Sequence, residues 1–369
     1  MKKVIFLLLF PILLTATLLP ETEFSGYFEN RFFLIFQTIK SDTENNGMLI
    51  GDYNRLRLKL NAVPSKKVKL NLAVDFFSFH GSILSPAGVN ENLSPNTGSG
   101  EDIKIDLDRA YADIYFKNFD LSIGKQRVAM GVSYLWAPLD IFNRVNFMEP
   151  KEEKPGVNAL KVYAPIGKDR SVTAVFLPDN DPGSSGKALR FKWTLFNIDA
   201  GLTYINRYRN YNNVYGLDLR GENFIGWWFE YGYFRTLTGD SEKLVIGMDY
   251  TFPIGKGVYW MSEYFFDGSG EPDHTEYDYE LLKSGERFIL GNNYLFSMLR
   301  YGVSDFASLS VSYIGNVKDG SFILNPSFSY ELFENVSLLT GVYIPMGKTG
   351  GEFNNQNIGA FFLWLKINF

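Results

Sequence analysis

The last twelve residues of the chain, 358–369, read "IGAFFLWLKINF" and alternate between two unlike faces. One face is wholly apolar and consists of Phe361, Leu363, Leu365, Ile367 and Phe369. The other face is mixed and holds Ala360, Phe362, Trp364, Lys366 and Asn368. A period of two residues is that of a β-strand, because successive side chains point to opposite sides. We expect the apolar side of this strand to lie against lipid.

The same alternation recurs along the chain, for example in "RLRLKLNAV" (55–63), "ALRFKWTLF" (188–196) and "FIGWWFEYGYF" (224–234). The apolar faces combine leucine with large aromatic residues, while the opposite faces are rich in Gly, Asp, Arg, Ser and Asn. Soluble β-sandwiches also alternate, but their cores favour Val, Ile and Leu. Outward aromatic residues around a polar interior are typical of a membrane β-barrel.

Three stretches have mixed faces: "KIDLDRAYADIYF" (104–116), "YWMSEYFFD" (259–267) and "FILGNNYLFSML" (288–299). A β-bulge shifts the alternation by one residue, and contact with a segment inside the barrel places apolar residues on both faces. Either cause is compatible with each of these stretches.

Short turns such as 64–67 and 254–257 alternate with nine longer links such as 131–156 and 268–286. This rhythm predicts an all-β protein, a transmembrane antiparallel up-and-down β-barrel of 18 strands, with 16 as the alternative. The short turns are expected on the periplasmic rim. The final strand is expected to pair with the first, about 24–39, because a closed barrel leaves no free edge.

The N-terminal stretch "MKKVIFLLLFPILLTATLLPETEF" has two lysines, an apolar run and then small residues around Ala16. That layout predicts a secretory signal. We expect a signal peptide over 1–19, cleaved near Ala16, and a barrel over 20–369. The alternative is a membrane anchor, but the run is short for a span of about 20 residues and contains Pro11.

The absence of cysteine excludes a disulfide framework and thiolate metal sites. The net charge of -5 gives no indication of nucleic-acid binding. The two histidines, His80 and His274, fall in predicted external links and form no catalytic motif. We therefore expect no enzyme activity, no metal and no cofactor.

A distinct motif occupies 120–147 and the strand after it. It comprises Gly124–Lys125–Gln126, Gly131, Pro138–Leu139–Asp140 and Asn143, followed by Gly156–Val157–Asn158–Ala159–Leu160. Here the chain resembles bacterial outer-membrane porin-like barrels of the Gly-Lys/Arg-Gln…Gly…Pro-x-Asp-x-x-Asn type, distantly similar to alginate-export barrels. Met130 stands where that family usually has Trp. The resemblance implies a channel, without indicating its solute.

In such a barrel the link 131–156 is expected to fold into the lumen and narrow it. Trp136, Phe142 and Phe147 would hold it to the wall. Its negative charge would come from Asp140, Glu149, Glu152 and Glu153. The alternative is an ordinary external loop with solvated charges.

A ladder of basic residues, Arg55, Arg57, Lys59 and the adjacent Lys69, is predicted to face inward. One interpretation is a constriction wall opposite the acidic link. The alternative is pairing with Asp75, Asp106 and Asp108 on neighbouring strands. Further inward positions are Gln126, Arg190 and Lys192. Because the inward acids and bases are similar in number, strong ion selectivity does not follow.

The sequence thus predicts an outer-membrane porin, exported by the Sec pathway, through which small hydrophilic solutes diffuse passively. The alternatives are a secretion channel for a polysaccharide and a surface barrel without transport. Expected partners are outer-membrane lipid, lipopolysaccharide and the barrel-insertion machinery, for which the C-terminal strand would be the signal. No nucleic acid is expected, and the oligomeric state is open between monomer and trimer.

Overall fold

The computed structural model describes residues 21–37, 47–81, 102–143, 154–237, 239–283, 287–354 and 358–369. The predicted signal peptide, 1–19, lies outside these residues. So do Phe147, Glu149, Glu152 and Glu153 of the link predicted to enter the lumen.

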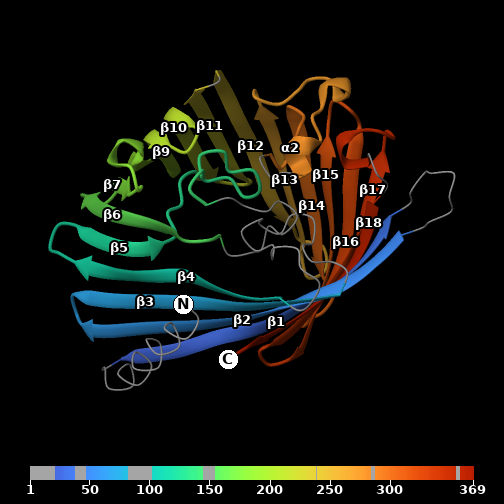
Figure 1. Cartoon of the computed structure of the whole chain (residues 1–369), viewed down its shortest axis with the longest axis horizontal. Helices are drawn as coiled ribbons and strands as arrows, with labels where there is room; N and C mark the ends of the chain where they lie inside the picture. Colours follow the sequence, from blue (N-terminus) through green and yellow to red (C-terminus); the bar gives the residue numbers. More distant parts are fainter. Residues whose placement is uncertain are drawn as a thin grey trace.

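The described chain forms 18 antiparallel strands, each hydrogen-bonded to the next, and the first pairs with the last (Figure 1). The first nine are β1 (Thr22–Gln37), β2 (Gly47–Ser65), β3 (Val68–Gly81), β4 (Asp102–Tyr115), β5 (Asp120–Gln126), β6 (Val157–Ile166), β7 (Arg170–Leu177), β8 (Gly186–Leu195) and β9 (Ile198–Tyr208). The others are β10 (Tyr211–Glu222), β11 (Gly226–Thr236), β12 (Asp240–Phe252), β13 (Val258–Asp267), β14 (Asn293–Gly302), β15 (Ala307–Asn316), β16 (Ser321–Phe333), β17 (Val336–Gly347) and β18 (Ile358–Asn368). The predicted barrel of 18 strands is confirmed.

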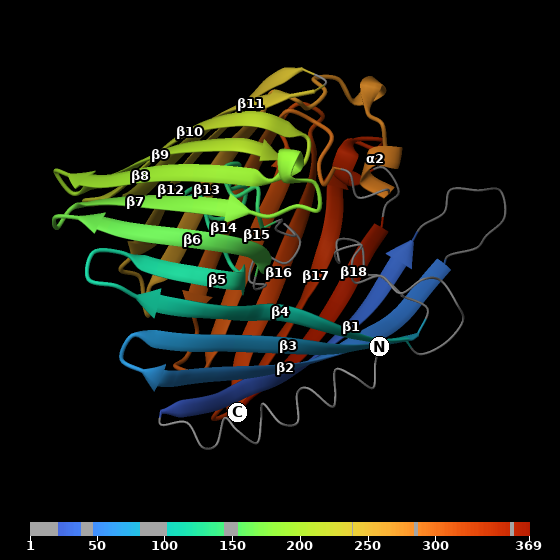
Figure 2. The same cartoon turned by 60° about the vertical axis from the view of Figure 1, so that its left-hand side comes forward.

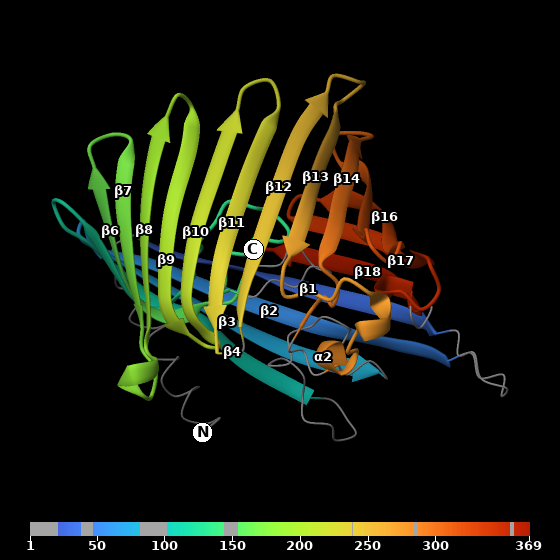
Figure 3. The same cartoon turned by 90° about the horizontal axis from the view of Figure 1, so that it is seen from above.

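Short helices occur only in the links of the described chain. They are η2 (Pro182–Ser184), η3 (His274–Glu276), α2 (Glu280–Lys283) and η4 (Glu352–Asn354). None of these described helices is long and apolar enough to cross a membrane. Figure 3 shows α2 at the rim opposite the short turns that join β8 to β9 and β10 to β11.

Closure of the barrel depends on β1, which lies beside both β2 and β18 (Figure 2). Phe33 is opposite Phe362, and Glu29 is opposite Lys366. The backbone N–H of Gly26 donates to the carbonyl of Phe369 at 2.8 Å, so the pairing extends to the last residue. A sheet closed in this way has no unpaired edge.

The two faces of β18 differ as the alternation predicts. Leu363, Ile367 and Phe369 are exposed on the outer face, while Phe361 and Leu365 on that face are half-buried. On the other face, Phe362 is only 2% exposed. The inner side of the barrel is less polar than expected, however, because Phe33, Tyr53, Phe77, Phe79 and Phe362 form a buried aromatic cluster there.

Both causes proposed for the mixed-face stretches are present. In β4 the register against β3 shifts at Asp108, since Arg109 pairs with Ala73 but Leu107 pairs with Val74. The inward residues of β13 and β14 instead contact a segment that crosses the interior, so these strands are apolar on both faces.

Candidate functional site: the barrel lumen and its inserted segment

Residues 127–143, here called the inserted segment, follow β5 and run inside the barrel (Figure 1, teal). Val128, Met130, Leu139 and Phe142 are buried in it. They pack against inward residues of β6 to β11: Ala159, Val175, Leu177, Ala188, Ile205, Val214 and Phe234. A second cluster joins Leu135 and Trp136 to Trp228, Val245, Met261, Phe265, Tyr294, Phe296 and Ile314. The described part of the predicted link therefore lies inside the lumen.

Two carboxylates from the wall hold the backbone of the inserted segment. Glu230 of β11 accepts hydrogen bonds from the backbone N–H groups of Val132 (2.8 Å), Ser133 (3.0 Å) and Leu139 (2.7 Å). Both Glu230 and Glu263 have no exposed surface. A buried carboxylate is tolerated when donors surround it, and hydrogen bonds to a charged acceptor are stronger than neutral ones.

Glu263 of β13 repeats this arrangement further along the segment. It accepts from the backbone N–H groups of Tyr134 (2.7 Å), Leu135 (2.9 Å) and Trp136 (3.3 Å). The indole Nε1 of Trp228 donates to the same carboxylate at 2.7 Å. The segment is thus fixed at two points of the wall by its own backbone.

Glycines provide the space for this contact. A Cβ atom on Gly131 would lie 2.5 Å from the carboxylate oxygens of Glu230, and Gly131 has a φ of +84°, which favours glycine. A Cβ on Gly216 of β10 would lie 2.5 Å from the Leu139 side chain. The close contact between the wall and the inserted segment therefore requires residues without a side chain at these two positions.

Aromatic and polar contacts complete the attachment. Trp136 stacks on Phe265 with ring centroids 5.0 Å apart, and Phe142 packs edge-on against Tyr208 at 4.8 Å. Asp140 was expected to give the segment negative charge, but it is buried and pairs with Lys154 and Asn143. Its charge is therefore neutralised locally.

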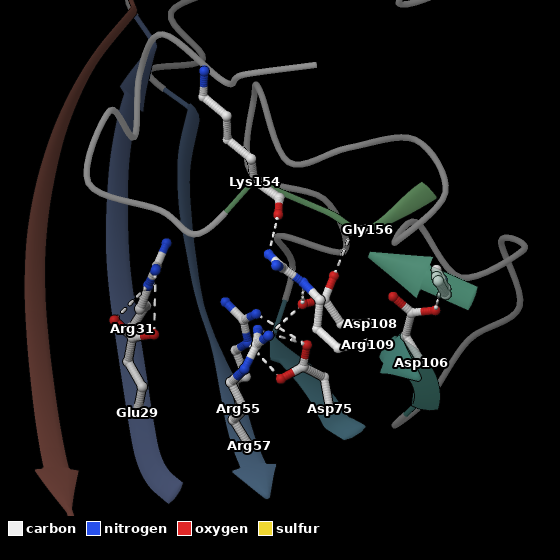
Figure 4. A network of polar contacts seen from close by, with 11 residues as sticks. Glu29, Arg31, Arg55, Arg57, Asp75, Asp106, Asp108, Arg109, Lys154 and Gly156 are labelled. Atoms are coloured by element: carbon white, nitrogen blue, oxygen red, sulfur yellow. Dashed lines mark hydrogen bonds and ion pairs between the residues drawn. The ribbon is translucent and has the colours of Figure 1, made fainter. Parts of the chain in front are cut away.

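The two arginines of the basic ladder, Arg55 and Arg57, pair with carboxylates of β3 and β4 (Figure 4). Arg55 makes two parallel hydrogen bonds to Asp75, each 3.0 Å long. Arg57 lies 3.2 Å from the same carboxylate and also contacts Asp108. The backbone N–H of Gly156 donates to Asp108 at 2.9 Å, which ties the end of the 131–156 link to this network. The geometry agrees with the pairing alternative for these residues.

The remaining predicted positions are distributed around the wall. Asp106 contacts Lys125 at 3.5 Å rather than the arginines. Arg190 binds Asp218 and Thr203, each at 2.8 Å, and Lys192 lies exposed two residues further along β8. Lys59 lies above the Tyr27 ring, with its Nζ 5.6 Å from the ring centroid, and Lys69 is opposite Asp113 on β4. Gln126 is buried and donates hydrogen bonds to the backbone carbonyls of Ser122 and Ala159.

A cavity of about 290 Å³ remains inside the barrel. One side of it carries aromatic and charged residues: Tyr27, Glu29, Arg31, Arg55, Trp364 and Lys366. The other side carries short polar residues: Ser310, Ser312, Asn325, Ser327, Ser329 and Ser337. Arg31 pairs with Glu29 at 3.0 Å and lies 4.5 Å above the Trp364 ring. Apolar residues such as Phe296, Met298 and Leu339 line the cavity as well, so its lining is mixed rather than wholly polar.

The sequence analysis did not assign the anchoring role of Glu230 and Glu263 or the serines of the cavity, although the sequence contains a pattern that marks them. Glu230 and Glu263 are single carboxylates in otherwise apolar stretches, "WWFEYGYF" and "WMSEYFF". Serine recurs at every second residue in "ASLSVSY" (307–313). In the residues that the structure describes, no group of three His, Asp or Glu is arranged to hold a metal ion.

Comparison with known proteins gives similarity in structure but not in sequence. No family model matches the chain, and no curated protein matches it. It is similar to OccK9 (OpdG) of Pseudomonas aeruginosa, with a TM-score of 0.61, 9% identity, and coverage of 95% of this chain and 99% of that one. It is also similar to a BenF-like porin from Pseudomonas fluorescens Pf-5, with a TM-score of 0.60, 10% identity, and coverage of 95% of this chain and 99% of that one. For OccAB4 of Acinetobacter baumannii the TM-score is 0.58 and the identity 11%, with coverage of 94% of this chain and 98% of that one. At these identities the likeness establishes the closed barrel fold.

Proposed function

We propose that this protein is an outer-membrane porin through which small hydrophilic solutes diffuse passively. The observation that carries the proposal is the inserted segment, which is anchored by Glu230 and Glu263, while a cavity with charged, polar and apolar lining residues remains inside the same barrel. A barrel of this strand number encloses more space than wall side chains fill. The segment narrows that space, and the proposal requires neither a cofactor nor an energy source.

A secretion channel for an acidic polysaccharide is less consistent with the lumen. Such a polymer would need a continuous path of available cations. Arg55, Arg57 and Arg190 instead contact Asp75, Asp108 and Asp218. The distant similarity to alginate-export barrels rests on the sequence motif alone. The motif residues Gly131 and Asn143 also have local roles, because they shape the inserted segment.

The cellular assignments belong to the same proposal. Residues 1–19 would direct export by the Sec pathway and be removed. The apolar face of β18, which ends on Phe369, would be read by the barrel-insertion machinery and then face lipid. Exposed aromatic residues such as Phe196 and Phe306 at the short-turn rim suit an interfacial aromatic girdle next to the lipid of the periplasmic leaflet. Lipopolysaccharide would contact the opposite rim.

Recording of single channels in planar bilayers tests the proposal. We expect steady openings with weak ion preference, because the lumen charges are paired. Preparations of detergent alone provide the control. A correctly folded barrel that gives no conductance would overturn the proposal. Swelling of liposomes in sugars of increasing size then measures the size limit, and block by long acidic oligosaccharides without sugar flux would favour the polysaccharide channel.

A further inference from the structure

Glu352 lies in η4, on the link between β17 and β18, and its side chain is buried. Its carboxylate accepts hydrogen bonds from the Tyr294 hydroxyl (2.6 Å) and from Asn316 Nδ2 (2.8 Å). It also accepts from the backbone N–H groups of Leu290 (2.6 Å) and Gly291 (3.3 Å). We call Glu352 and these four partners the external clasp.

The external clasp joins links that are distant in the sequence. Leu290 and Gly291 end the link that follows β13, Asn316 ends β15, and Glu352 belongs to the link after β17. The backbone N–H of Glu352 donates to Asp319, which also accepts from Ser321, so the β15–β16 turn is included. The carboxylates of Glu352 and Asp319 together therefore join three links at the rim opposite the short turns.

The clasp also touches the inserted segment. Tyr294, whose hydroxyl binds Glu352, has its ring 5.3 Å from the ring of Trp136. Trp136 stacks on Phe265, and its backbone N–H donates to Glu263. An unbroken set of contacts thus runs from an external link to the anchor of the segment inside the lumen.

We propose that Glu352 is a positioning residue for the inserted segment and acts on it through Tyr294 and Trp136. The inference rests on the proposed porin function, because the segment then sets the width of the channel. Glu352 is not among the residues that line the cavity. The contacts that lead from Glu352 to the inserted segment run through Tyr294 and Trp136.

A thiol reporter tests this coupling without relying on conduction. The chain contains no cysteine, so Ser133→Cys introduces a single thiol in the inserted segment. The Ser133 hydroxyl is buried, and we expect slow reaction of this thiol with a water-soluble reagent in the folded barrel. Glu352→Ala in that background should raise the reaction rate about fivefold or more, the factor that corresponds to one lost hydrogen bond.

Two further variants distinguish coupling through Tyr294 and Trp136 from a general destabilisation of the barrel. Tyr294→Phe keeps the ring against Trp136 and removes only the hydroxyl, so it should change the rate in the same direction as Glu352→Ala. In a Trp136→Ala background, Glu352→Ala should add little, because residues on one path are not additive. Asp273→Asn is the matched control, since this exposed residue caps η3 and asparagine also caps.

The proposal is overturned if Glu352→Ala leaves the reaction rate unchanged, or if Asp273→Asn raises it equally. It is also overturned if Tyr294→Phe has no effect while Glu352→Ala does. Bilayer recordings of the same variants separate the two proposals. A wild-type barrel without conductance contradicts the porin function, whereas normal conductance with an unchanged thiol rate contradicts only the role of Glu352.

Discussion

The inner wall of the barrel has two regions that satisfy their buried charges differently. The open wall, formed by the inner faces of β1–β4, pairs side chain with side chain, as in Arg55 with Asp75. The covered wall, formed by the inner faces of β6–β14, lies against the inserted segment. There Glu230 and Glu263 receive backbone N–H groups instead of cations.

The difference shows that an inward carboxylate has no fixed role in a barrel. On the open wall, carboxylates cancel the charge of arginines beside the cavity. On the covered wall, Glu230 and Glu263 serve as acceptors for a chain segment that has no strand partner of its own, although Asp218 on that wall pairs with Arg190. Buried backbone N–H groups need acceptors, and the wall supplies them where the segment passes. Removing Asp75 should therefore alter the charge of the open wall, whereas removing Glu263 should alter the attachment of the inserted segment.

Glu263→Ala should have the largest effect. It leaves three backbone donors and the Trp228 indole without their acceptor, which we expect to cost on the order of 4 kcal/mol of attachment. Single-channel recordings should show larger, unsteady openings. Glu222→Ala is the control, because Glu222 is exposed at the end of β10. Steady wild-type conductance in Glu263→Ala would mean that the segment is held mainly by apolar packing.

Asp75→Asn should act on the open wall. Arg55 and Arg57 lose a charged partner, which should lower the free energy of unfolding by about 3 kcal/mol and make the lumen more positive. A reversal potential in a salt gradient should shift toward anion preference. The exposed pair of Asp305 with Lys256 provides the control, because Asp305→Asn should change stability by less than about 1 kcal/mol. An unshifted reversal potential would show that the ladder does not face the solute path.

Gly216→Ala should act only on the covered wall. Its methyl group would lie against Leu139, so we expect a loss of about 2 kcal/mol in stability from overpacking. Gly302→Ala is the matched control, because the nearest atom to a Cβ there is at an ordinary contact distance of 3.7 Å. Thermal unfolding of the two variants measures the difference. Equal melting temperatures would argue against close contact between the segment and β10.

The smallest effect should be a pH dependence at the external clasp. Burial raises the pKa of the Glu352 carboxyl above its ordinary value, although its four hydrogen bonds act in the opposite direction. The folded state then binds the proton more tightly than the unfolded state, so the protein should lose stability as the pH rises through the folded pKa. The melting temperature of wild type relative to Glu352→Gln should therefore fall with rising pH. A rise would mean that the hydrogen bonds outweigh burial.

Much of the fold could be predicted from local pattern. The alternation of Leu363 and Ile367 with Trp364 and Lys366 marked β18 as a two-faced strand, and the rhythm of short and long links led to 18 strands. Less of the candidate site could be predicted from the sequence. Arg57 and Asp75 were recognised as partners because they are on adjacent strands, where the register places them opposite each other. Glu230 and Glu263 were not, because their partners are about 100 residues or more away in the sequence.

The sequence by itself determined the strands, their two faces and the closure of the barrel, because these depend on a period of two residues and on neighbouring strands. Only the tertiary structure decided which part of the inner wall is covered. The apolar inward residues Val175 and Val214 look out of place in a polar lumen until the inserted segment packs on them. That contact joins segments with no shared register, and close packing, not periodicity, specifies it.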